Sequence, residues 1–352
     1  ILYADVPLIT TASLNKLIKS AQRKKISILT SKITKPKGYG RIIRDEKMNP
    51  TNIREEADAS TQEKTINEIF TGIMIADNEF LKNGLKGLVR NNKAGEYYLT
   101  DLVEYASKRK LPIGSTEAKE LEVFGANNKK ELEGLYNAMV ALNIDAAKKK
   151  GTFFKDTSTC YVEGVLKVGK DVSIGNNVTI KGNVVLGNDV SIGSNVILSN
   201  TKIGSNSTIK EFCSIEDSKI SENVEVGPFA RLRNGAVLDN SAKIGNFVEV
   251  KKSRIGQNAK ANHHAYIGDA EIGKKSNIGA GTITCNYDGE NKHKTKIAES
   301  VFIGSNSSLV APLKVGKKSY VAAGSVVTSD VPAGSLAFGR AKQKNKTNWK
   351  KK

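Results

Sequence analysis

Histidine is the residue type in this chain best suited to move a proton near neutral pH, and the chain has only three: His263, His264 and His293. A histidine that faces solvent is, by itself, more often an ordinary surface residue than a catalyst. Zinc chemistry needs three histidines on one ion, whereas His263 and His264 are adjacent and should point apart. Cys285 is a candidate nucleophile, but nothing near it indicates an activated thiolate, so a structural thiol is the simpler interpretation. From residue type alone, the histidines are therefore either candidates for acid–base chemistry or ordinary surface residues.

The histidines lie within a six-residue repeat. Six residues suit one short strand plus one corner, and three such units close a triangular coil of about 18 residues that stacks on its neighbours. Corners such as Gly175-Asn-Asn177 tolerate the positive φ of a sharp bend. The pattern predicts a parallel β-solenoid of roughly nine coils, about 40 Å tall. An unbroken series of the repeat consists of Ile174, Ile180, Leu186, Ile192 and Leu198.

The repeat is broken once near the histidines. Thirteen residues separate Thr284 from Ile297 where six would do, so an excess of seven residues must leave the coil as a loop over 285–294. Solenoids often carry function on such insertions. Ala261, Ala265 and Ile267 keep the inward phase, which places His263, His264 and Tyr266 outward or at a corner.

The first 128 residues follow a different pattern. Helical and strand-like segments alternate there, which predicts a layered α/β domain, followed by a linker helix over 129–151 and the solenoid over 152–352. Asp5 follows an apolar run, so it should end a strand, where a carboxylate can hold Mg²⁺ against a phosphate or simply make a turn. Because the chain opens directly on that run, we expect it to be a fragment of a longer protein.

Composition limits the kinds of partner. The 352 residues carry a net charge of +19, partly in the segment 340–352. The basic residues are not interleaved with aromatic ones, so anionic small molecules such as nucleotides or coenzyme A are favoured over nucleic acid. A basic tail that is merely solvated is the default interpretation. No apolar run approaches the roughly 18 residues of a membrane span, and no signal peptide is visible. Three well-separated cysteines suit a reducing cytoplasm.

Several longer motifs resemble one known family, the bifunctional enzymes that make UDP-N-acetylglucosamine. The motifs in the first half are similar to its uridylyltransferase domain: Tyr3-Ala-Asp-Val-Pro-Leu8, Gly38-Tyr-Gly-Arg-Ile42, Gly95-Glu-Tyr-Tyr-Leu-Thr-Asp101 and Gly125-Ala-Asn-Asn128. Those in the second half are similar to its hexapeptide-repeat acetyltransferase domain: Gly227-Pro-Phe-Ala-Arg-Leu-Arg233, Gly245-Asn-Phe-Val-Glu249 and Asn277-Ile-Gly-Ala-Gly-Thr-Ile-Thr-Cys-Asn-Tyr-Asp-Gly289. The resemblance implies a left-handed coil, which periodicity alone cannot reveal because parallel crossovers are normally right-handed. It also implies a homotrimer whose subunits share each acetyl site.

The resemblance further implies acetyl transfer from acetyl-coenzyme A to glucosamine 1-phosphate. His263 would be the general base, and Asn286 and Tyr287 would position the acetyl group, with Asn286 also able to donate to the oxyanion. The sugar phosphate would contact Arg233, Lys251, Tyr266 and Asn277. Acetyl-coenzyme A would further contact Ala280, Ser305, Ala323 and Arg340.

For the first half, the resemblance implies uridylyl transfer from UTP to N-acetylglucosamine 1-phosphate with release of pyrophosphate. Asp5 and Asn127 would hold Mg²⁺, and Gly40 and Glu55 would contact the nucleotide sugar. Phe70 stands where the family has Asn, which removes a polar contact. Roughly the first hundred residues of the family are absent, including the Gly-rich loop that cradles phosphates, so we expect this fragment to lack uridylyl transfer.

Two other interpretations stay open. In one, the chain is a sugar nucleotidyltransferase whose solenoid is purely structural, although a bare scaffold needs no loop over 285–294. In the other, the basic tail binds nucleic acid or membrane and no acetyl transfer occurs. The first predicts no acetyl transfer by the solenoid, and the second predicts retention on heparin that depends on residues 342–352.

Overall fold

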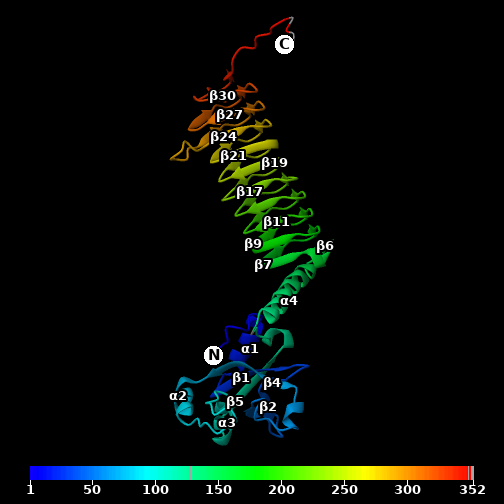
Figure 1. Cartoon of the computed structure of the whole chain (residues 1–352), viewed down its shortest axis with the longest axis vertical. Coiled ribbons are helices and arrows are strands. Elements are labelled where there is room, and N and C mark those ends of the chain that lie inside the picture. The colour runs from blue at the N-terminus through cyan, green and yellow to red at the C-terminus, as the bar shows by residue number, and fades with distance from the viewer. Residues whose placement is uncertain (127, 348, 350–352) are drawn as a thin grey trace. The chain divides into compact units, whose positions relative to one another are not determined.

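The computed structural model describes residues 1–126, 128–347 and 349. The chain forms two compact units, Ile1–Met139 and Val140–Lys352, and the helix α4 (Lys129–Lys148) begins in the first and ends in the second (Figure 1). Among the described residues, no helix is long and apolar enough to cross a membrane.

The first unit is built on a five-stranded mixed sheet with the order β3-β2-β4-β1-β5. β1 pairs parallel to β5 and antiparallel to β4, while β2 pairs antiparallel to β3 and β4. The strands are β1 (Ile26–Lys32), β2 (Arg41–Arg44), β3 (Pro50–Arg54), β4 (Glu68–Ala76) and β5 (Ile113–Ala118). The helices are α1 (Thr11–Ser20), α2 (Asn78–Lys86) and α3 (Asp101–Lys108), with short 3-10 turns at Glu63–Thr65 and Glu120–Val123.

Side chains alternate between the two faces of this sheet, which gives the unit two cores. Ile26 and Ile28 of β1 pack in one core with Phe80 of α2 and Leu102 of α3. Leu29 of β1 packs in the other core, which includes Leu17 of α1. The predicted layered α/β arrangement is therefore present, with α2 and α3 on one side of the sheet and α1 on the other.

The second unit is a left-handed parallel β-helix of hexapeptide repeats, as predicted. Each turn contributes a short strand to three faces. Face 1 consists of β6 (Phe153–Phe154), β8 (Ser173–Ile174), β10 (Ser191–Ile192), β13 (Thr208–Ile209), β16 (Glu225–Val226), β23 (Asn277–Ile278), β26 (Phe302–Ile303), β29 (Tyr320–Val321), β31 (Leu336–Ala337) and the first halves of β19 (Lys243–Lys251) and β21 (Lys260–Gly268).

Face 2 follows face 1 along the chain, and face 3 follows face 2. Face 2 holds β11 (Ile197–Ser199), β14 (Ser214–Glu216), β17 (Arg231–Arg233), β24 (Ile283–Cys285), β27 (Ser308–Val310), β30 (Val326–Val327) and the second halves of β19 and β21. Face 3 holds β12 (Lys202–Ile203), β15 (Lys219–Ile220), β18 (Val237–Leu238), β20 (Arg254–Ile255), β22 (Ala270–Ile272), β25 (Thr295–Ile297) and β28 (Leu313–Val315). β7 (Tyr161–Val168) and β9 (Thr179–Leu186) run over faces 2 and 3, after a 3-10 turn at Thr157–Thr159.

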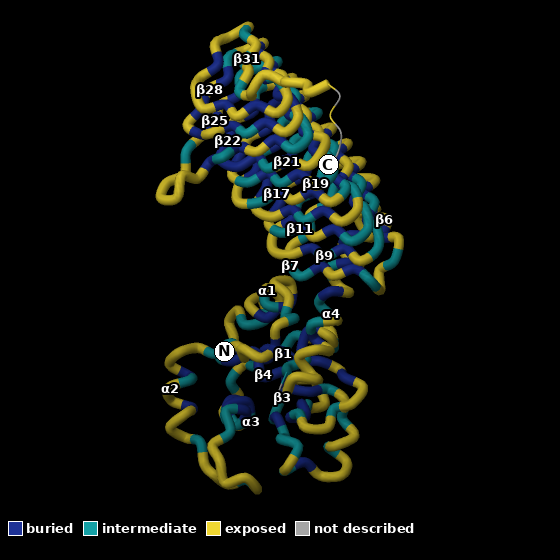
Figure 2. The backbone as a smooth tube through the Cα atoms, turned by 45° about the horizontal axis from the view of Figure 1, so that its top comes forward, coloured by how far each residue is buried: buried dark blue, intermediate teal, exposed yellow. Residues whose placement is uncertain are grey.

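The aliphatic repeat forms the core of the coil. Ile192 pairs with Ile174 below and Ile209 above, so side chains separated by one turn stack directly on each other. All three are at most 2% exposed, and such burial is worth about 1.5–3 kcal/mol for each aliphatic side chain. Figure 2 shows buried positions recurring along the strands and exposed ones at many corners. The coil has about ten turns, slightly more than the roughly nine predicted, because Phe154 and Ala337 extend the stack at its two ends.

The corners have the left-handed backbone conformation that the Gly and Asn residues predicted. At the first corner, between faces 1 and 2, Asn195 has φ 59° and Gly281 has φ 73°. Three phenylalanines also adopt this conformation there, although it costs a non-glycine residue about 1–2 kcal/mol. Phe212, Phe229 and Phe247 have φ between 54° and 58°, and their rings stack with centroids 4.8 and 5.2 Å apart.

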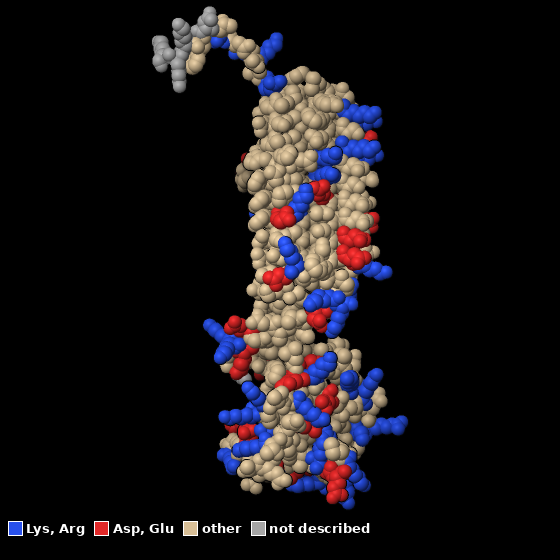
Figure 3. All heavy atoms as spheres, turned by 90° about the vertical axis from the view of Figure 1, so that its right-hand side faces the viewer, with Lys and Arg blue, Asp and Glu red and all other residues tan. Residues whose placement is uncertain are grey.

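Charged side chains cover parts of the solenoid as ion pairs. Figure 3 shows basic and acidic atoms next to one another at several heights of the second unit. Arg254 bonds both carboxylate oxygens of Asp239 at 2.9 Å, and Lys274 lies 3.1 Å from Glu299. Exposed pairs of this kind contribute little stability, roughly 0–1 kcal/mol each.

Candidate active site

His263 lies at the first corner, where β21 passes from face 1 to face 2. Its strand position pairs with Asn246 of β19, one turn below. The Nδ1 atom of His263 is 2.8 Å from Oδ1 of Asn246. With the amide oxygen turned toward it, Nδ1 donates and Nε2 keeps its lone pair. The exposed imidazole is then in the tautomer that can accept a proton through Nε2.

Three residues expected to contact acetyl-coenzyme A stack above His263 in the same corner column. The backbone N–H of Asn306 donates to the Ala280 carbonyl at 2.7 Å, and that of Gly324 donates to the Ser305 carbonyl at 2.8 Å. These bonds put Ala280, Ser305 and Ala323 in successive turns at the corner that holds His263. We call this column of Asn246, His263, Ala280, Ser305 and Ala323 the site edge.

The site edge ends near Arg340. The side chain of Arg340 comes within 3.8 Å of the position that a Cβ on Gly324 would occupy. Three strand spacings separate His263 from Ala323, or about 14 Å. The small side chains between them leave a long shelf, with a proton acceptor at one end and a guanidinium at the other.

A cluster of cations lies at the second corner, between faces 2 and 3. Arg233 and Lys251 are paired across β17 and β19. The nearby Lys292 amine lowers the pKa of Lys251, and partial desolvation and Arg233 act in the same direction. Nε of Arg233 is 2.6 Å from Oε1 of Glu249, which partly compensates this charge. A bound phosphate would neutralise the positive charge that Glu249 leaves uncompensated.

Lys292 was not among the sequence-based candidates. It lies in the insertion over 285–294, and only the contact with Lys251 reveals that the loop returns to this corner. Two sugar-binding candidates lie elsewhere. Tyr266 sits on face 2 between the two corners, paired with Ile283, whereas Asn277 lies on face 1 and pairs with Lys260. The structure therefore gathers Arg233, Lys251 and Tyr266 on face 2 and leaves Asn277 on the neighbouring face.

The insertion leaves the coil between β24 and β25 and projects from its side (Figure 1). Asn286 is 6% exposed, and its Nδ2 donates to Oδ2 of Asp269 at 2.6 Å. Asp269 is itself buried and lies 3.8 Å from the Lys252 amine. One of the two Asn286 N–H groups is thus already engaged, which leaves the second N–H and the amide oxygen for a substrate. Tyr287, the next residue, is 59% exposed.

The structure does not bring all the acetyl-site candidates to one corner of the chain. Asn286 lies next to Asp269, which follows His263 by six positions, a separation of at most about 20 Å along a strand. His263 and the site edge are at the first corner, whereas Asn286, Tyr287, Arg233 and Lys251 are at the second.

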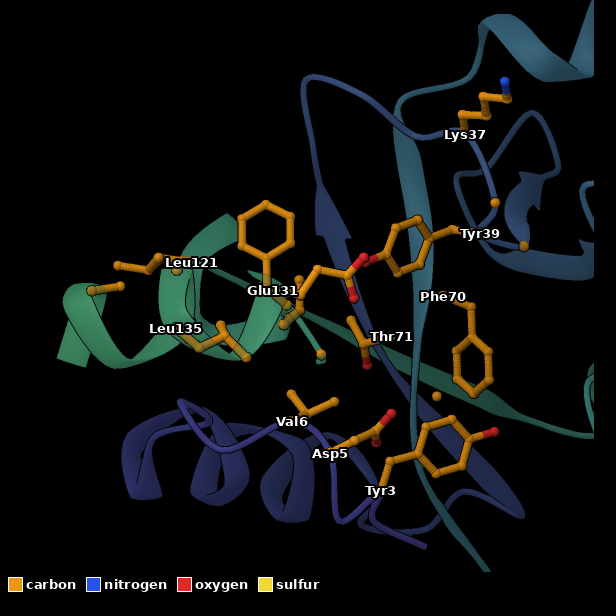
Figure 4. A pocket seen from close by; sticks show the side chains of 18 of the residues that line it. Tyr3, Asp5, Val6, Lys37, Tyr39, Phe70, Thr71, Leu121, Glu131 and Leu135 are labelled. Atoms are coloured by element: carbon orange, nitrogen blue, oxygen red, sulfur yellow. The ribbon is translucent and has the colours of Figure 1, made fainter. Parts of the chain in front are cut away.

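The first unit contains a separate cavity of about 710 Å³. Asp5, Gly40, Glu55 and Phe70 all line it, as do Tyr39 and Glu131. Figure 4 shows Asp5, Phe70 and Tyr39 around the same space, with the Glu131 carboxylate turned toward the Tyr39 hydroxyl. Burial raises the pKa of Tyr39, and Glu131 and Asp5 add to this effect.

Two close contacts shape this cavity. A Cβ on Gly40 would come within 2.8 Å of Ile53 and 3.3 Å of Glu55, so only glycine leaves this approach open. Oε1 of Glu55 accepts from the Thr100 hydroxyl at 2.9 Å. The Phe70 ring lines the wall where the family resemblance predicts an amide, so the expected polar contact is missing from that position.

The expected metal ligands are only partly placed. The prediction that Asp5 ends a strand is wrong: Asp5 lies in a turn, because the segment before it pairs with β4 only through Ile1 and Met74. Asp5 nevertheless lines the cavity and can act as a carboxylate ligand, whereas Asn127 lies outside the described residues. Among the residues that are described, no group of three or more His, Cys, Asp or Glu side chains is arranged to hold a metal ion. Mg²⁺ usually keeps several waters and needs only one or two protein carboxylates beside a phosphate, so Asp5 fits such an ion.

The fold and the site edge define a hexapeptide-repeat β-helix protein. Residues 294–329 match the family model "Hexapeptide repeat of succinyl-transferase", and residues 157–245 match "GMPPB C-terminal domain". A solved UDP-N-acetylglucosamine acyltransferase of Arabidopsis aligns with 51% of this chain and 69% of its own, at 20% identity and a TM-score of 0.46.

Longer matches define the family. The Bifunctional protein GlmU of Idiomarina loihiensis is 45% identical over 352 residues, which is 100% of this chain and 77% of that protein. The Bifunctional protein GlmU of Acinetobacter baylyi is 47% identical, with the same coverage. The chain belongs to the bifunctional GlmU family of transferases.

Proposed function

We propose that the solenoid transfers the acetyl group of acetyl-coenzyme A to the amine of glucosamine 1-phosphate. The observation that carries this proposal is the site edge, which aligns His263 with the shelf of Ala280, Ser305 and Ala323. The pantetheine arm would lie along the shelf, and Arg340 would meet the phosphates of the coenzyme. The thioester would then lie next to the imidazole.

The chemistry requires one base and no covalent enzyme intermediate. The substrate ammonium first loses a proton to Nε2 of His263, and the free amine then attacks the thioester carbonyl carbon. As the tetrahedral intermediate collapses, the C–S bond breaks and the nitrogen loses a second proton, which leaves an amide; coenzyme A departs as a thiolate and takes up that proton. A free N–H of Asn286 would stabilise the oxyanion. Arg233, Lys251 and Lys292 would hold the substrate phosphate, and Tyr266 and Asn277 would contact the sugar.

We further propose that each site is completed between copies of the chain in a homotrimer. The separation of His263 from Asn286 by the width of face 2 supports this arrangement. A second support is the row of stacked rings beside the site edge, because Phe212, Phe229 and Phe247 are 46–57% exposed. A neighbouring copy would cover these rings and bring its own second corner to His263.

Release of free thiol from acetyl-coenzyme A, dependent on glucosamine 1-phosphate, tests the reaction. The rate should fall by at least about 10² in His263→Ala, the usual scale of a lost general base. Unchanged turnover in that variant would remove the base assignment. Absence of thiol release in the wild-type chain would favour the alternative in which the solenoid is only structural.

Mixed subunits test the shared site. Chains carrying His263→Ala and chains carrying Asn286→Ala would be unfolded together, refolded at a one-to-one ratio and assayed. If each site takes these two residues from different chains, random assortment restores about a quarter of the sites. If both residues act within one chain, mixing restores none, and the trimer proposal fails.

The cavity of the first unit supports binding of a sugar nucleotide, the product of uridylyl transfer to N-acetylglucosamine 1-phosphate. We propose that Gly40 and Glu55 contact the sugar nucleotide and that Asp5, together with Asn127, holds Mg²⁺, which would neutralise phosphate charge. UDP-N-acetylglucosamine should bind this unit, and Glu55→Ala should weaken its binding by calorimetry, whereas His263→Ala should not. Equal binding by the wild-type and Glu55→Ala chains would contradict the assignment. We also propose a cytoplasmic location, which the three unpaired cysteines support.

A further inference from the structure

The insertion over 285–294 folds as a small hairpin that is closed by its own side chains. Tyr287 and Lys292 form an antiparallel bridge. Oδ1 of Asp288 accepts the backbone N–H groups of Glu290 at 2.8 Å and of Asn291 at 2.6 Å. Its other oxygen, Oδ2, lies 2.6 Å from Nε2 of His293. The Asp288 carboxylate therefore joins the turn to the returning strand.

The base of the hairpin is held independently of its tip. Asn286 bonds the buried Asp269, and the backbone N–H of His293 donates to the Asn286 carbonyl at 2.8 Å. One residue further, the Lys294 amine lies 3.3 Å from Glu271 on face 3. The two strands are thus anchored where they leave the coil.

The functional side chains beyond this base are held mainly within the hairpin. The Tyr287 hydroxyl donates to the Gly289 carbonyl in the turn, and Lys292 lies against a second cation, Lys251, which does not attract it. Tyr287 is 59% exposed and Lys292 is exposed, so packing against the core does not fix either one. A two-stranded hairpin that stands alone in water is at best marginally stable. The orientation of both side chains consequently depends on the contacts that close the hairpin.

We propose that His293 is a positioning residue for acetyl transfer, because its bond to Asp288 holds Tyr287 and Lys292 in place over the shared site. This inference rests on the proposed acetyltransferase function. A carboxylate only accepts hydrogen bonds, so Nε2 of His293 must carry a proton whether the ring is neutral or charged. The backbone N–H of Asn291, the His293 ring and the Glu290 N–H hold the pKa of Asp288 far below its usual range, so the acceptor persists at all physiological pH values. The other charged groups of the hairpin are Glu290, Lys292 and Lys294.

Kinetics of four variants test this role. In His293→Ala and in Asp288→Ala, kcat/KM for acetyl-coenzyme A should fall about tenfold or more, since misplaced contact groups are costly for reaction geometry. The double variant should be no worse than Asp288→Ala alone, because the contact removed by His293→Ala is already lost when Asp288 is replaced. His293→Gln should recover much of the activity, since its amide N–H can still donate to Asp288. Lys274→Ala is the control and should remain close to wild type, because it breaks only an exposed ion pair with Glu299 outside the hairpin.

Two results would overturn the inference: a His293→Ala rate within about twofold of wild type, or single-variant losses that simply multiply in the double variant. Thermal unfolding of each variant shows whether the coil is intact. Inactivity of the wild-type chain would instead reject the proposed function.

A spectroscopic readout is independent of turnover. With only three histidines, the ring nitrogens of His293 can be assigned by comparing ¹⁵N spectra of the wild-type and His293→Ala chains. A ring that carries a proton on Nε2, and whose Nε2 signal shifts in Asp288→Ala, is the expected result. A ring protonated on Nδ1 alone would contradict the contact itself.

Discussion

The bond between Asn246 and His263 predicts a graded loss of activity. Asn246→Ala removes the acceptor 2.8 Å from Nδ1 and leaves the imidazole itself intact. The ring can then rotate and adopt the tautomer with the proton on Nε2, which leaves no lone pair on that atom to accept the substrate proton. We expect kcat of thiol release to fall, with little change in KM for either substrate.

The size of the loss follows from the kind of bond. A neutral hydrogen bond contributes about 0.5–1.5 kcal/mol net. Since about 1.4 kcal/mol corresponds to a tenfold change in rate, kcat should fall about two- to twelvefold. The loss in His263→Ala should be at least about 10². The two variants therefore separate a residue that orients the base from the base itself.

Steady-state kinetics across a range of pH complete this test. In Asn246→Asp a carboxylate would favour the protonated ring, so the acid limb of the rate profile should move to higher pH. Asn195→Ala is a suitable control, because it breaks an amide contact with Asn177 at the same corner, several turns below the site. The reasoning is refuted if Asn246→Ala is as damaging as His263→Ala, or if Asn195→Ala is equally harmful.

Three further predictions concern the same unit. Asp269→Ala leaves the buried Asn286 amide without its partner, so kcat/KM for acetyl-coenzyme A should fall about 10–100-fold in the same assay, as for a lost charged hydrogen bond. Leu232→Ala empties a fully buried position of the coil and should lower the free energy of unfolding in urea by about 2–5 kcal/mol. Burial raises the pKa of Cys213 to about 11, so iodoacetamide at pH 8 should alkylate the more accessible Cys285 first by mass spectrometry, and Cys285→Ser should retain acetyl transfer.

The coil could be predicted from the sequence because its determinants are local. Each inward aliphatic residue and each corner glycine or asparagine is specified within six positions, and the structure places Ile174, Ile192 and Ile209 in one stack. The excess length between Thr284 and Ile297 likewise predicts a loop without knowledge of its neighbours. The phenylalanines at the first corner were not predicted. The preference for glycine and asparagine at corners reflects their tolerance of positive φ, and it does not reveal that phenylalanine can occupy such positions when its rings stack on one another.

The site edge could not be derived from spacing alone. Its members are separated by steps of 17, 25 and 18 residues, from His263 to Ala280, Ser305 and Ala323, so no fixed period connects them. The step of 25 contains the insertion, and only strand pairing shows that the column continues beyond it. The family resemblance named these residues, whereas Asn246, Asp269 and Lys292 emerged only from contacts between different turns.

The stiffness of the coil bears on how His263 and the insertion over 285–294 could serve one proposed site, although they lie at opposite corners of face 2. Neighbouring strands of the coil are held by continuous parallel pairing, so face 2 cannot fold over to bring His263 to Asn286. The two corners can meet only if one copy presents its first corner to the second corner of another, and a closed ring of three identical copies repeats that contact without leaving an unpaired edge. In the proposed trimer, the stiff coil would hold each half of the site at a fixed height, and the hairpin closed by Asp288 and His293 would extend across the gap between two copies.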